Sequence, residues 1–166
     1  MNLKTKTTVT AALFAALICI TTLIIKIPSP FKGYMNLGDC VVLLSGWLLP
    51  PFYSFFAAAI GSALADIFSG YIIYVPITFV IKGLMALCAN LIFNKAHNFM
   101  GATAAAVIGG IAAEILMSTG YYIFEGILYG FIPSLAGIPA NIVQGIAGLI
   151  TGLLLLKLLK VHISKK

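Results

Sequence analysis

Long apolar runs that carry no charge constrain this chain more than any other feature of its sequence. One extends from Val9 to Ile25, and no charged residue occurs between Glu125 and Lys157. Of the 166 residues, 61% are hydrophobic and 8% are charged, and a soluble domain of this length has too little interior to hide so much apolar surface. The sequence therefore predicts an all-α integral membrane protein with a single domain over residues 1–166.

At about 20 residues for each span, the chain has room for five or six membrane helices. Six are expected, at residues 8–25, 37–49, 52–68, 77–93, 101–124 and 138–159. Three longer loops, residues 26–36, 69–76 and 125–137, follow the first, third and fifth spans. The predicted architecture is a six-transmembrane-helix bundle whose longer loops form lids on one side.

Lysines predict the orientation in the membrane. With six spans, the two termini share one side with these lysines: Lys4, Lys6, Lys95, Lys157, Lys160, Lys165 and Lys166. The other side carries Lys26 and Lys32, and Lys82 falls within a span. Because lysines concentrate on cytoplasmic loops, both termini are expected in the cytoplasm and the longer loops outside. A five-span arrangement would weaken this bias.

Small residues in the first span repeat every four positions and therefore share helix faces. Ala11 lies above Ala15 in this way, and Ala12 above Ala16. Small side chains at this spacing let another helix approach closely. That helix can belong to the same bundle or to another protein. The position near the cytoplasmic end makes these four alanines the best candidates for a partner-docking surface.

Charged groups within the apolar segments need partners. Asp39 begins the second span, where a carboxylate can cap backbone N–H groups, and Asp66 precedes the expected turn at Gly70. Both acids are interpreted as structural polar residues. Lys82 lies deeper in its span, and three interpretations stay open for it: snorkelling to the surface, pairing with Asp66 or Glu114, or contact with a ligand.

Polar side chains in the last two long spans line up along helix faces. The fifth span has a stripe formed by Glu114, Ser118, Tyr121 and Glu125, and the sixth has Asn141 and Gln144 on one face. Because these groups concentrate in the outer half, a solute pocket is favoured over a purely structural polar network. The candidate ligand contacts are Thr78, Lys82, Glu114, Tyr121, Asn141 and Gln144.

Aromatic residues are frequent in the longer loops: Tyr34, Tyr71, Tyr74, Tyr129 and Phe131. They fit either an aromatic belt at the lipid headgroups or lids over a pocket that opens outward.

Several function classes are disfavoured. The lysines mark helix ends rather than a basic soluble face, so no nucleic-acid partner is expected. Cys19, Cys40 and Cys88 lie in apolar segments and are interpreted as small buried residues, with neither a disulfide frame nor a metal site. No catalytic or nucleotide-binding motif is recognised, so an enzyme is not expected. The polar residues do not continue to the cytoplasmic face, which disfavours a channel or a complete transporter.

Four segments resemble the substrate-binding S components of energy-coupling factor (ECF) vitamin transporters. They are "AALFAAL" in the first span, "YMNLGD" before the second, "GSALADIFSGYIIYVPITFVIKGL" across the third and fourth, and "IPANIVQGIAG" in the sixth. The resemblance covers nearly the whole chain. It is closest to the branch that includes the pyridoxine or hydroxymethylpyrimidine binders and the riboflavin binders.

The resemblance implies a transport subunit in the bacterial plasma membrane. Its partners would be a membrane scaffold subunit and two ATPase subunits, which bind ATP and Mg²⁺, so that this chain itself needs no cofactor. The alanines of the first span would dock on the scaffold. The outer loops and the fourth to sixth spans would form the pocket.

The charges around the expected pocket suit a neutral or weakly cationic heteroaromatic ligand with hydroxyl groups. Pyridoxine or a hydroxymethylpyrimidine fits this description, and riboflavin is the alternative. Two other classes are kept as alternatives: a self-sufficient small transporter and a structural subunit that binds no ligand.

Overall fold

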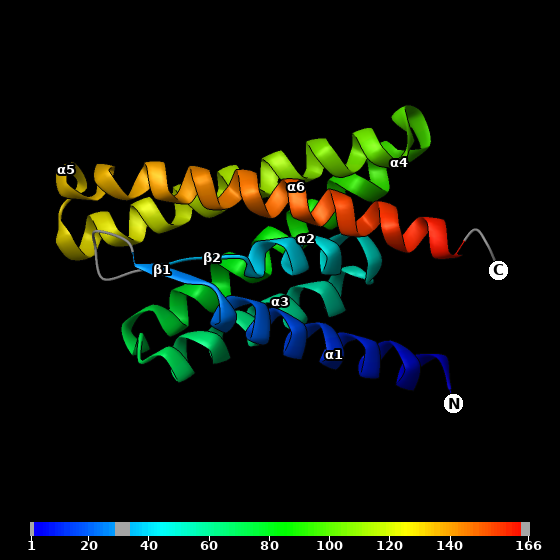
Figure 1. Ribbon diagram of the computed structural model, residues 1–166, viewed down its shortest axis with the longest axis horizontal. Helices are drawn as coiled ribbons and strands as arrows, with labels where there is room; N and C mark the ends of the chain where they lie inside the picture. The colour runs from blue at the N-terminus through cyan, green and yellow to red at the C-terminus, as the bar shows by residue number, and fades with distance from the viewer. Residues whose placement is uncertain (1, 29–33, 164–166) are drawn as a thin grey trace.

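The computed structural model describes residues 2–28 and 34–163, with side chains as far as residue 159. Most of this part of the chain is helical (Figure 1). In chain order the elements are α1 (Leu3–Ile24), β1 (Lys26–Pro28), β2 (Tyr34–Asn36), α2 (Gly38–Leu48), α3 (Pro51–Ser69), η1 (Ile72–Tyr74), α4 (Val75–Tyr129), α5 (Phe131–Ser134), η2 (Leu135–Gly137) and α6 (Ile138–Ile163).

Among the described residues, four helical stretches are long and apolar enough to cross a membrane: Leu3–Ile24, Pro51–Ser69, Ile72–Tyr129 and Phe131–Leu159. The predicted count of six spans is not confirmed. One expected span corresponds to α2, which has 11 residues. Two others lie within the 55 residues of α4.

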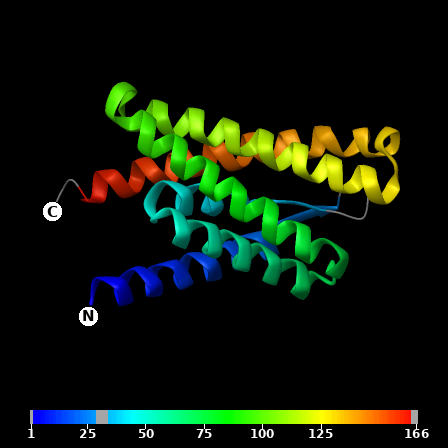
Figure 2. The same ribbon diagram turned by 180° about the vertical axis from the view of Figure 1, so that it is seen from behind.

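Residues 94–100, between the expected fourth and fifth spans, are helical, because α4 continues through them. The chain instead reverses direction at Gly101, whose φ of 80° and ψ of 159° are not helical (Figure 2). Glycine tolerates this conformation because it has no Cβ. The two arms of α4 therefore run side by side in opposite directions.

The expected loop at residues 26–36 contains two short strands, so the prediction of an all-α fold needs correction. β1 and β2 pair antiparallel, with Ile27 opposite Met35. Residues 29–33 between them, including Lys32, lie outside the described residues. The second loop turns at Gly70, which has a φ of 79° and donates its backbone N–H to Ile67. The strands and this turn lie at the end of the molecule opposite the first residues of α1 and the last of α6 (Figure 1).

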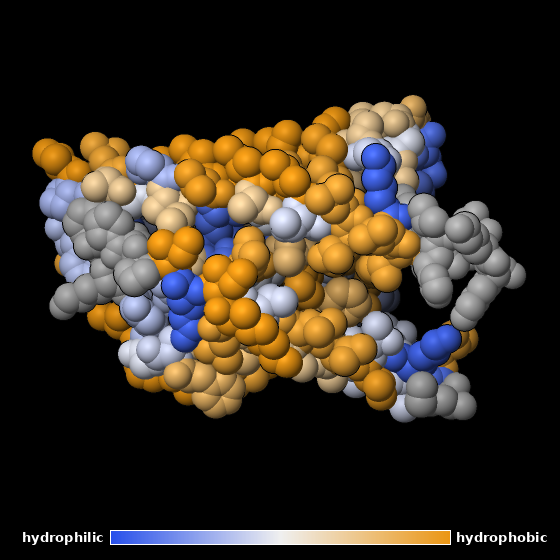
Figure 3. All heavy atoms as spheres, in the orientation of Figure 1, coloured by the Kyte–Doolittle hydropathy of each residue, from blue (hydrophilic) through white to orange (hydrophobic). Residues whose placement is uncertain are grey.

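On the face shown in Figure 3, apolar side chains cover the middle and hydrophilic residues gather toward the two ends. Large apolar side chains are exposed along the long helices, among them Leu13, Ile20, Ile115, Ile146 and Leu154. Such a band is typical of a helical protein whose middle faces lipid. Lys4, Lys6 and Lys157 lie toward the end that carries the termini, where α1 begins and α6 ends. Lys165, Lys166 and the side chain of Lys160 lie outside the description.

The short helix α2 forms the centre of the bundle. All its residues from Gly38 to Trp47 are buried. At its C-terminal end, Asn90 of α4 supplies the donors for two buried carbonyl groups: its Nδ2 donates to Gly46 O at 2.6 Å and to the O of Leu49, the residue after α2, at 2.8 Å. Because an unpaired carbonyl in an apolar interior is costly, Asn90 lets α2 end inside the bundle.

The four alanines predicted to dock a partner lie on two different surfaces. Ala11 is buried against Leu49 and Ala57, and Ala15 packs at the edge of this cluster. A Cβ at Gly61 of α3 would lie 2.5 Å from the Ala15 carbonyl oxygen. One face of α1 therefore packs within the bundle. Ala12 and Ala16 are exposed and remain accessible to a partner.

Candidate functional site

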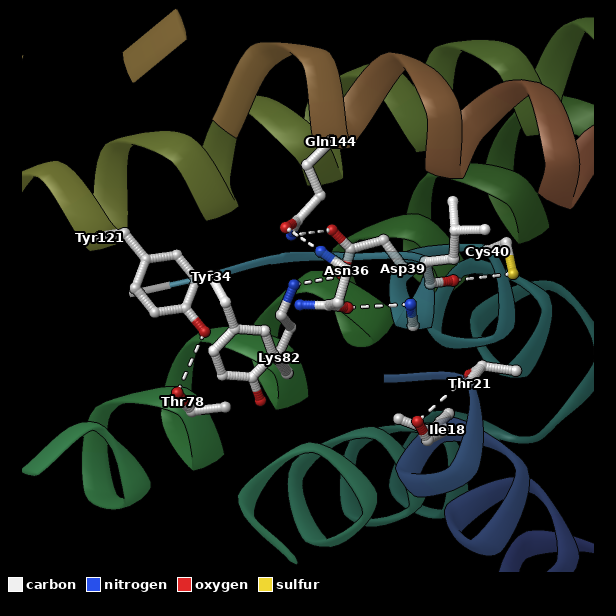
Figure 4. A network of polar contacts seen from close by, with 12 residues as sticks. Ile18, Thr21, Tyr34, Asn36, Asp39, Cys40, Thr78, Lys82, Tyr121 and Gln144 are labelled. Carbon is white, nitrogen blue, oxygen red and sulfur yellow. Dashed lines mark hydrogen bonds and ion pairs between the residues drawn. The ribbon is translucent and has the colours of Figure 1, made fainter. Parts of the chain in front are cut away.

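A chain of polar contacts crosses the bundle at the start of α2 (Figure 4). Lys82 of α4 forms an ion pair with Asp39 Oδ1, and Gln144 Nε2 of α6 donates to Asp39 Oδ2 at 2.7 Å. The Asn36 backbone N–H donates to Gln144 Oε1 at 2.9 Å. Both oxygens of the buried carboxylate are thus paired, as a charge in an apolar interior requires.

The structure differs from one interpretation of these charges, and it gives Lys82 a partner that the open alternatives did not include. Asp39 does not cap α2 through its side chain. Asn36 does this instead, because its Oδ1 accepts a hydrogen bond from the Gly38 backbone N–H at 2.9 Å. Lys82 pairs with Asp39 rather than with Asp66 or Glu114.

Glycines of α6 make room for the acids. A Cβ at Gly148 would lie 2.8 Å from Asp39 Cβ, and a Cβ at Gly145 would lie 3.0 Å from Glu114 Oε2. A larger residue at Gly148 would require α6 and α2 to shift apart, and one at Gly145 would require the Glu114 side chain to move. The close approach of α6 also brings Gln144 within reach of Asp39.

Tyr121 extends the polar region toward the strands. Its hydroxyl lies 3.1 Å from Thr78 Oγ1, and Lys82 Nζ lies 5.7 Å from the centre of its ring. This distance is typical of a cation–π contact. The lysine therefore lies between the Tyr121 ring and the Asp39 carboxylate, as Figure 4 shows.

Tyr34 connects strand β2 to helix α3. Its hydroxyl donates to Asp66 Oδ1 at 2.7 Å, and its ring centre lies 4.8 Å from that of Tyr71. Burial, together with the adjacent Asp66 carboxylate, raises the pKa of Tyr34 far above its usual value. The Asp66 carboxylate thus bonds a side chain of the strand. The Tyr71 N–H donates to the main-chain oxygen of Asp66 at 2.9 Å, which is a contact of the backbone and not of the carboxylate.

These groups surround a cavity at the strand end of the bundle. Of the six predicted ligand contacts, five line it: Thr78, Lys82, Tyr121, Asn141 and Gln144. The described residues leave a volume of about 50 Å³, which is enough for a few water molecules. A vitamin-sized ligand would therefore require the surrounding side chains or loops to move apart.

Glu114, the sixth predicted contact, is not among the cavity-lining residues. It borders a separate, mainly apolar groove between the second arm of α4 and α6, together with Ile115 and Ile142. It is 7 residues deeper along the helix than Tyr121, a distance of roughly 10 Å. Glu114 and Tyr121 can lie on the same helix face, as periodicity predicted. Glu114 is nevertheless too far along the helix to line the cavity.

Further residues line the cavity that were not among the predicted contacts: Thr22, Tyr34, Met35, Asn36, Ser62, Asp66, Tyr71, Tyr74 and Glu125. The tyrosines had a visible signal, since aromatic residues in the loops suggested lids. Asn36 had no such signal in the sequence, because a single asparagine before a helix predicts a helix cap and not a cavity-lining residue. Its position depends on the pairing of β1 with β2.

The fold is shared with solved S components of ECF transporters, a class of helical membrane proteins. The structure matches an S component of a bacterial ECF transporter with a TM-score of 0.72, at 24% identity, over 96% of this chain and 98% of the other. It also matches an S component for biotin from an ECF-type ABC transporter with a TM-score of 0.57, at 20% identity, over 95% of each chain.

The chain belongs to the family described as "ECF-type riboflavin transporter, S component", which it matches over residues 2–161. It is also 34% identical over 136 residues to an uncharacterized protein in the gap 3′ region of Pyrococcus woesei, covering 81% of this chain and 88% of that protein. This is a family of transport subunits and not of enzymes.

Proposed function

We propose that this chain is the high-affinity substrate-binding subunit of an ATP-driven ECF vitamin importer, and that it binds a small hydroxylated heteroaromatic compound. Pyridoxine and hydroxymethylpyrimidine are the ligands that best fit this description. The observation that carries the proposal is the cavity itself, which combines tyrosine rings with paired charges at one end of the bundle. Rings can stack on the tyrosines, and hydroxyl groups can hydrogen-bond to the polar side chains.

The charges at the cavity favour a ligand that is neutral or weakly cationic. Lys82 is the one cation among its described lining residues, and Asp39 already neutralises it. Asp66 and Glu125 add two acids to the lining. A phosphorylated or otherwise anionic ligand would face these acids with no free cation among the described lining residues to balance its charge, so it should be rejected.

Riboflavin is the second candidate, because the matching family is described as a riboflavin transporter S component. The small volume favours a single ring over a three-ring system, since the larger ligand requires more extensive displacement of the lining. In either case, the proposed ligand contacts are the five predicted residues that line the cavity.

The partners are also part of the proposal. A scaffold subunit and two ATPases would supply the energy, and they would bind the ATP and Mg²⁺. The exposed face of α1 around Ala12 and Ala16 would dock on the scaffold. The lysine-rich end would then face the cytoplasm, which agrees with the positive-inside rule.

Equilibrium binding to the purified protein tests the ligand. Isothermal titration with pyridoxine, hydroxymethylpyrimidine and riboflavin is expected to show tight binding of one of the single-ring compounds. Tight binding of riboflavin alone would select the second candidate. Flux through vesicles that contain this chain without partners would show a self-sufficient transporter instead.

A further inference from the structure

Two acids at the cavity share one arrangement, in which a tyrosine hydroxyl occupies a single carboxylate oxygen. Tyr34 donates to Asp66 Oδ1 at 2.7 Å, and Tyr74 donates to Glu125 Oε1 at 3.4 Å. The second oxygens, Asp66 Oδ2 and Glu125 Oε2, have no hydrogen-bond partner among the residues that the structure describes. Both acids line the cavity.

The two unpaired oxygens are buried. The acids are only 5% and 6% exposed, and each of these oxygens is almost fully hidden from solvent. An acceptor buried without a donor is unfavourable, and lipid offers no replacement. A tyrosine already fixes the orientation of each carboxylate, so the remaining oxygen cannot turn away without losing that bond. The two oxygens therefore remain as acceptors without a donor, on acids that line the cavity.

Aromatic rings connect the two acids. The Tyr34 and Tyr71 ring centres are 4.8 Å apart, and those of Tyr71 and Tyr74 are 6.4 Å apart. The three tyrosines form an aromatic wall that begins at Asp66 and ends at Glu125. The rings are tilted to one another, by 46° and 77°, so a ligand ring would contact them by a face or an edge in the region between the two acids.

We infer that Asp66 and Glu125 determine specificity, each by accepting a hydrogen bond from a donor group on a different edge of the ligand ring. The inference rests on the proposed function and narrows its substrate class. The ligand carries at least two separated donors, such as hydroxymethyl, amino or protonated ring-nitrogen groups. Rings without donors, and rings whose substituents are carboxylates or phosphates, are rejected.

A binding cycle between ligand and protein tests this directly. Pyridoxine is compared with the analogue in which one hydroxymethyl group is replaced by methyl, on wild type, Asp66→Asn and Glu125→Gln. An amide has the same shape but can present an N–H donor where the carboxylate presents an acceptor. Each variant is expected to bind pyridoxine about 10- to 100-fold more weakly, the range for a hydrogen bond to a charged group. For one of the two variants, removing the hydroxyl should cause no further loss.

Controls separate specific contacts from general damage. Glu114→Gln changes an acid that lies in the groove outside the cavity, and it is expected to keep wild-type affinity. The thermal midpoint of each variant shows whether it folds. If one variant does not fold, the comparison of the two ligands is made with the other variant and the wild type. If pyridoxine binds the wild type and both amide variants equally well, the inference is overturned while the proposed function stands. If no ring in the panel binds the wild type, the proposed function fails and the inference fails with it.

Discussion

Lys82 and Asp39 form an ion pair inside the bundle although they lie 43 residues apart in the chain. Their side chains are only 4% and 0% exposed. Lys82 lines the cavity, whereas Asp39 lies behind it and also accepts a hydrogen bond from Gln144. The pair therefore joins the central helix α2 to the wall of the proposed binding site.

Replacing Lys82 by Met should strongly destabilise the protein. The change leaves Asp39 buried without its cation, and breaking one side of a buried pair costs about 3–5 kcal/mol. Adding Asp39→Asn should restore most of the lost stability, because no uncompensated charge remains. Ligand binding should stay weak in the double variant, since Lys82 faces the cavity. Unfolding in detergent measures the stability, and a single variant as stable as the wild type would contradict the account.

The two faces of α1 should respond differently to a large side chain. Ala12 is exposed, so Ala12→Trp should leave ligand binding intact and abolish uptake when the complete transporter is present. Ala11 packs against Leu49 and Ala57, so Ala11→Trp should lower stability and impair binding as well. Binding assays and uptake assays on the same variants make the comparison. Loss of binding in Ala12→Trp would argue against a docking role for this face.

Asn90 should matter for stability although it is not at the cavity. In Asn90→Leu the carbonyls of Gly46 and Leu49 lose their donor, at a cost of about 1–3 kcal/mol for each buried group. Asn94→Leu is the matched control, because Asn94 donates only to the Asn90 side chain in the contacts described. A thermal midpoint that falls no further for Asn90→Leu than for this control would refute the role assigned to Asn90.

The hydrogen bond between Tyr34 and Asp66 has a defined pH dependence. The folded-state pKa of Tyr34 is raised above 10.0, its ordinary value, which the unfolded chain retains. Its stabilising contribution is therefore complete below about pH 10 and decreases as the pH rises from there toward the folded-state pKa. The difference in thermal midpoint between wild type and Tyr34→Phe should stay constant from about pH 7 to 10 and shrink above that range. A difference that shrinks already at neutral pH would contradict the burial of Tyr34.

Helical periodicity accounts for what the sequence could predict of the site. Periodicity predicted Tyr121, Asn141 and Gln144 as site residues, because polar residues on one face of an apolar helix tend to face the interior of the bundle rather than lipid. All three line the cavity. Periodicity predicts which face of its helix a residue occupies, but not which residue of another helix lies at the same depth in the bundle. Glu114 was therefore assigned to the cavity although it lies below it, and Asp39 was not recognised as the partner of Lys82.

Local patterns were also insufficient for the strand pairing and for the exact position of the bend in α4. The pairing of β1 with β2 places Tyr34 beside Asp66. Strands of three residues are too short to show a sequence pattern from which this pairing could be predicted. The bend in α4 follows from one glycine, Gly101, since residues 94–100 are all compatible with a helix. The long apolar runs, by contrast, predicted a helical membrane protein, because composition alone requires lipid around them.

Native mass spectrometry of the purified, detergent-solubilised protein tests the central claim most directly, because it weighs the small molecule that the protein retains. The account predicts one molecule for each chain, with the mass of a single-ring compound such as pyridoxine or hydroxymethylpyrimidine, and its loss in Lys82→Met. A protein that retains riboflavin would contradict the proposed ligand. A protein that retains nothing, and binds none of these compounds when they are added, would contradict its role as a vitamin-binding subunit.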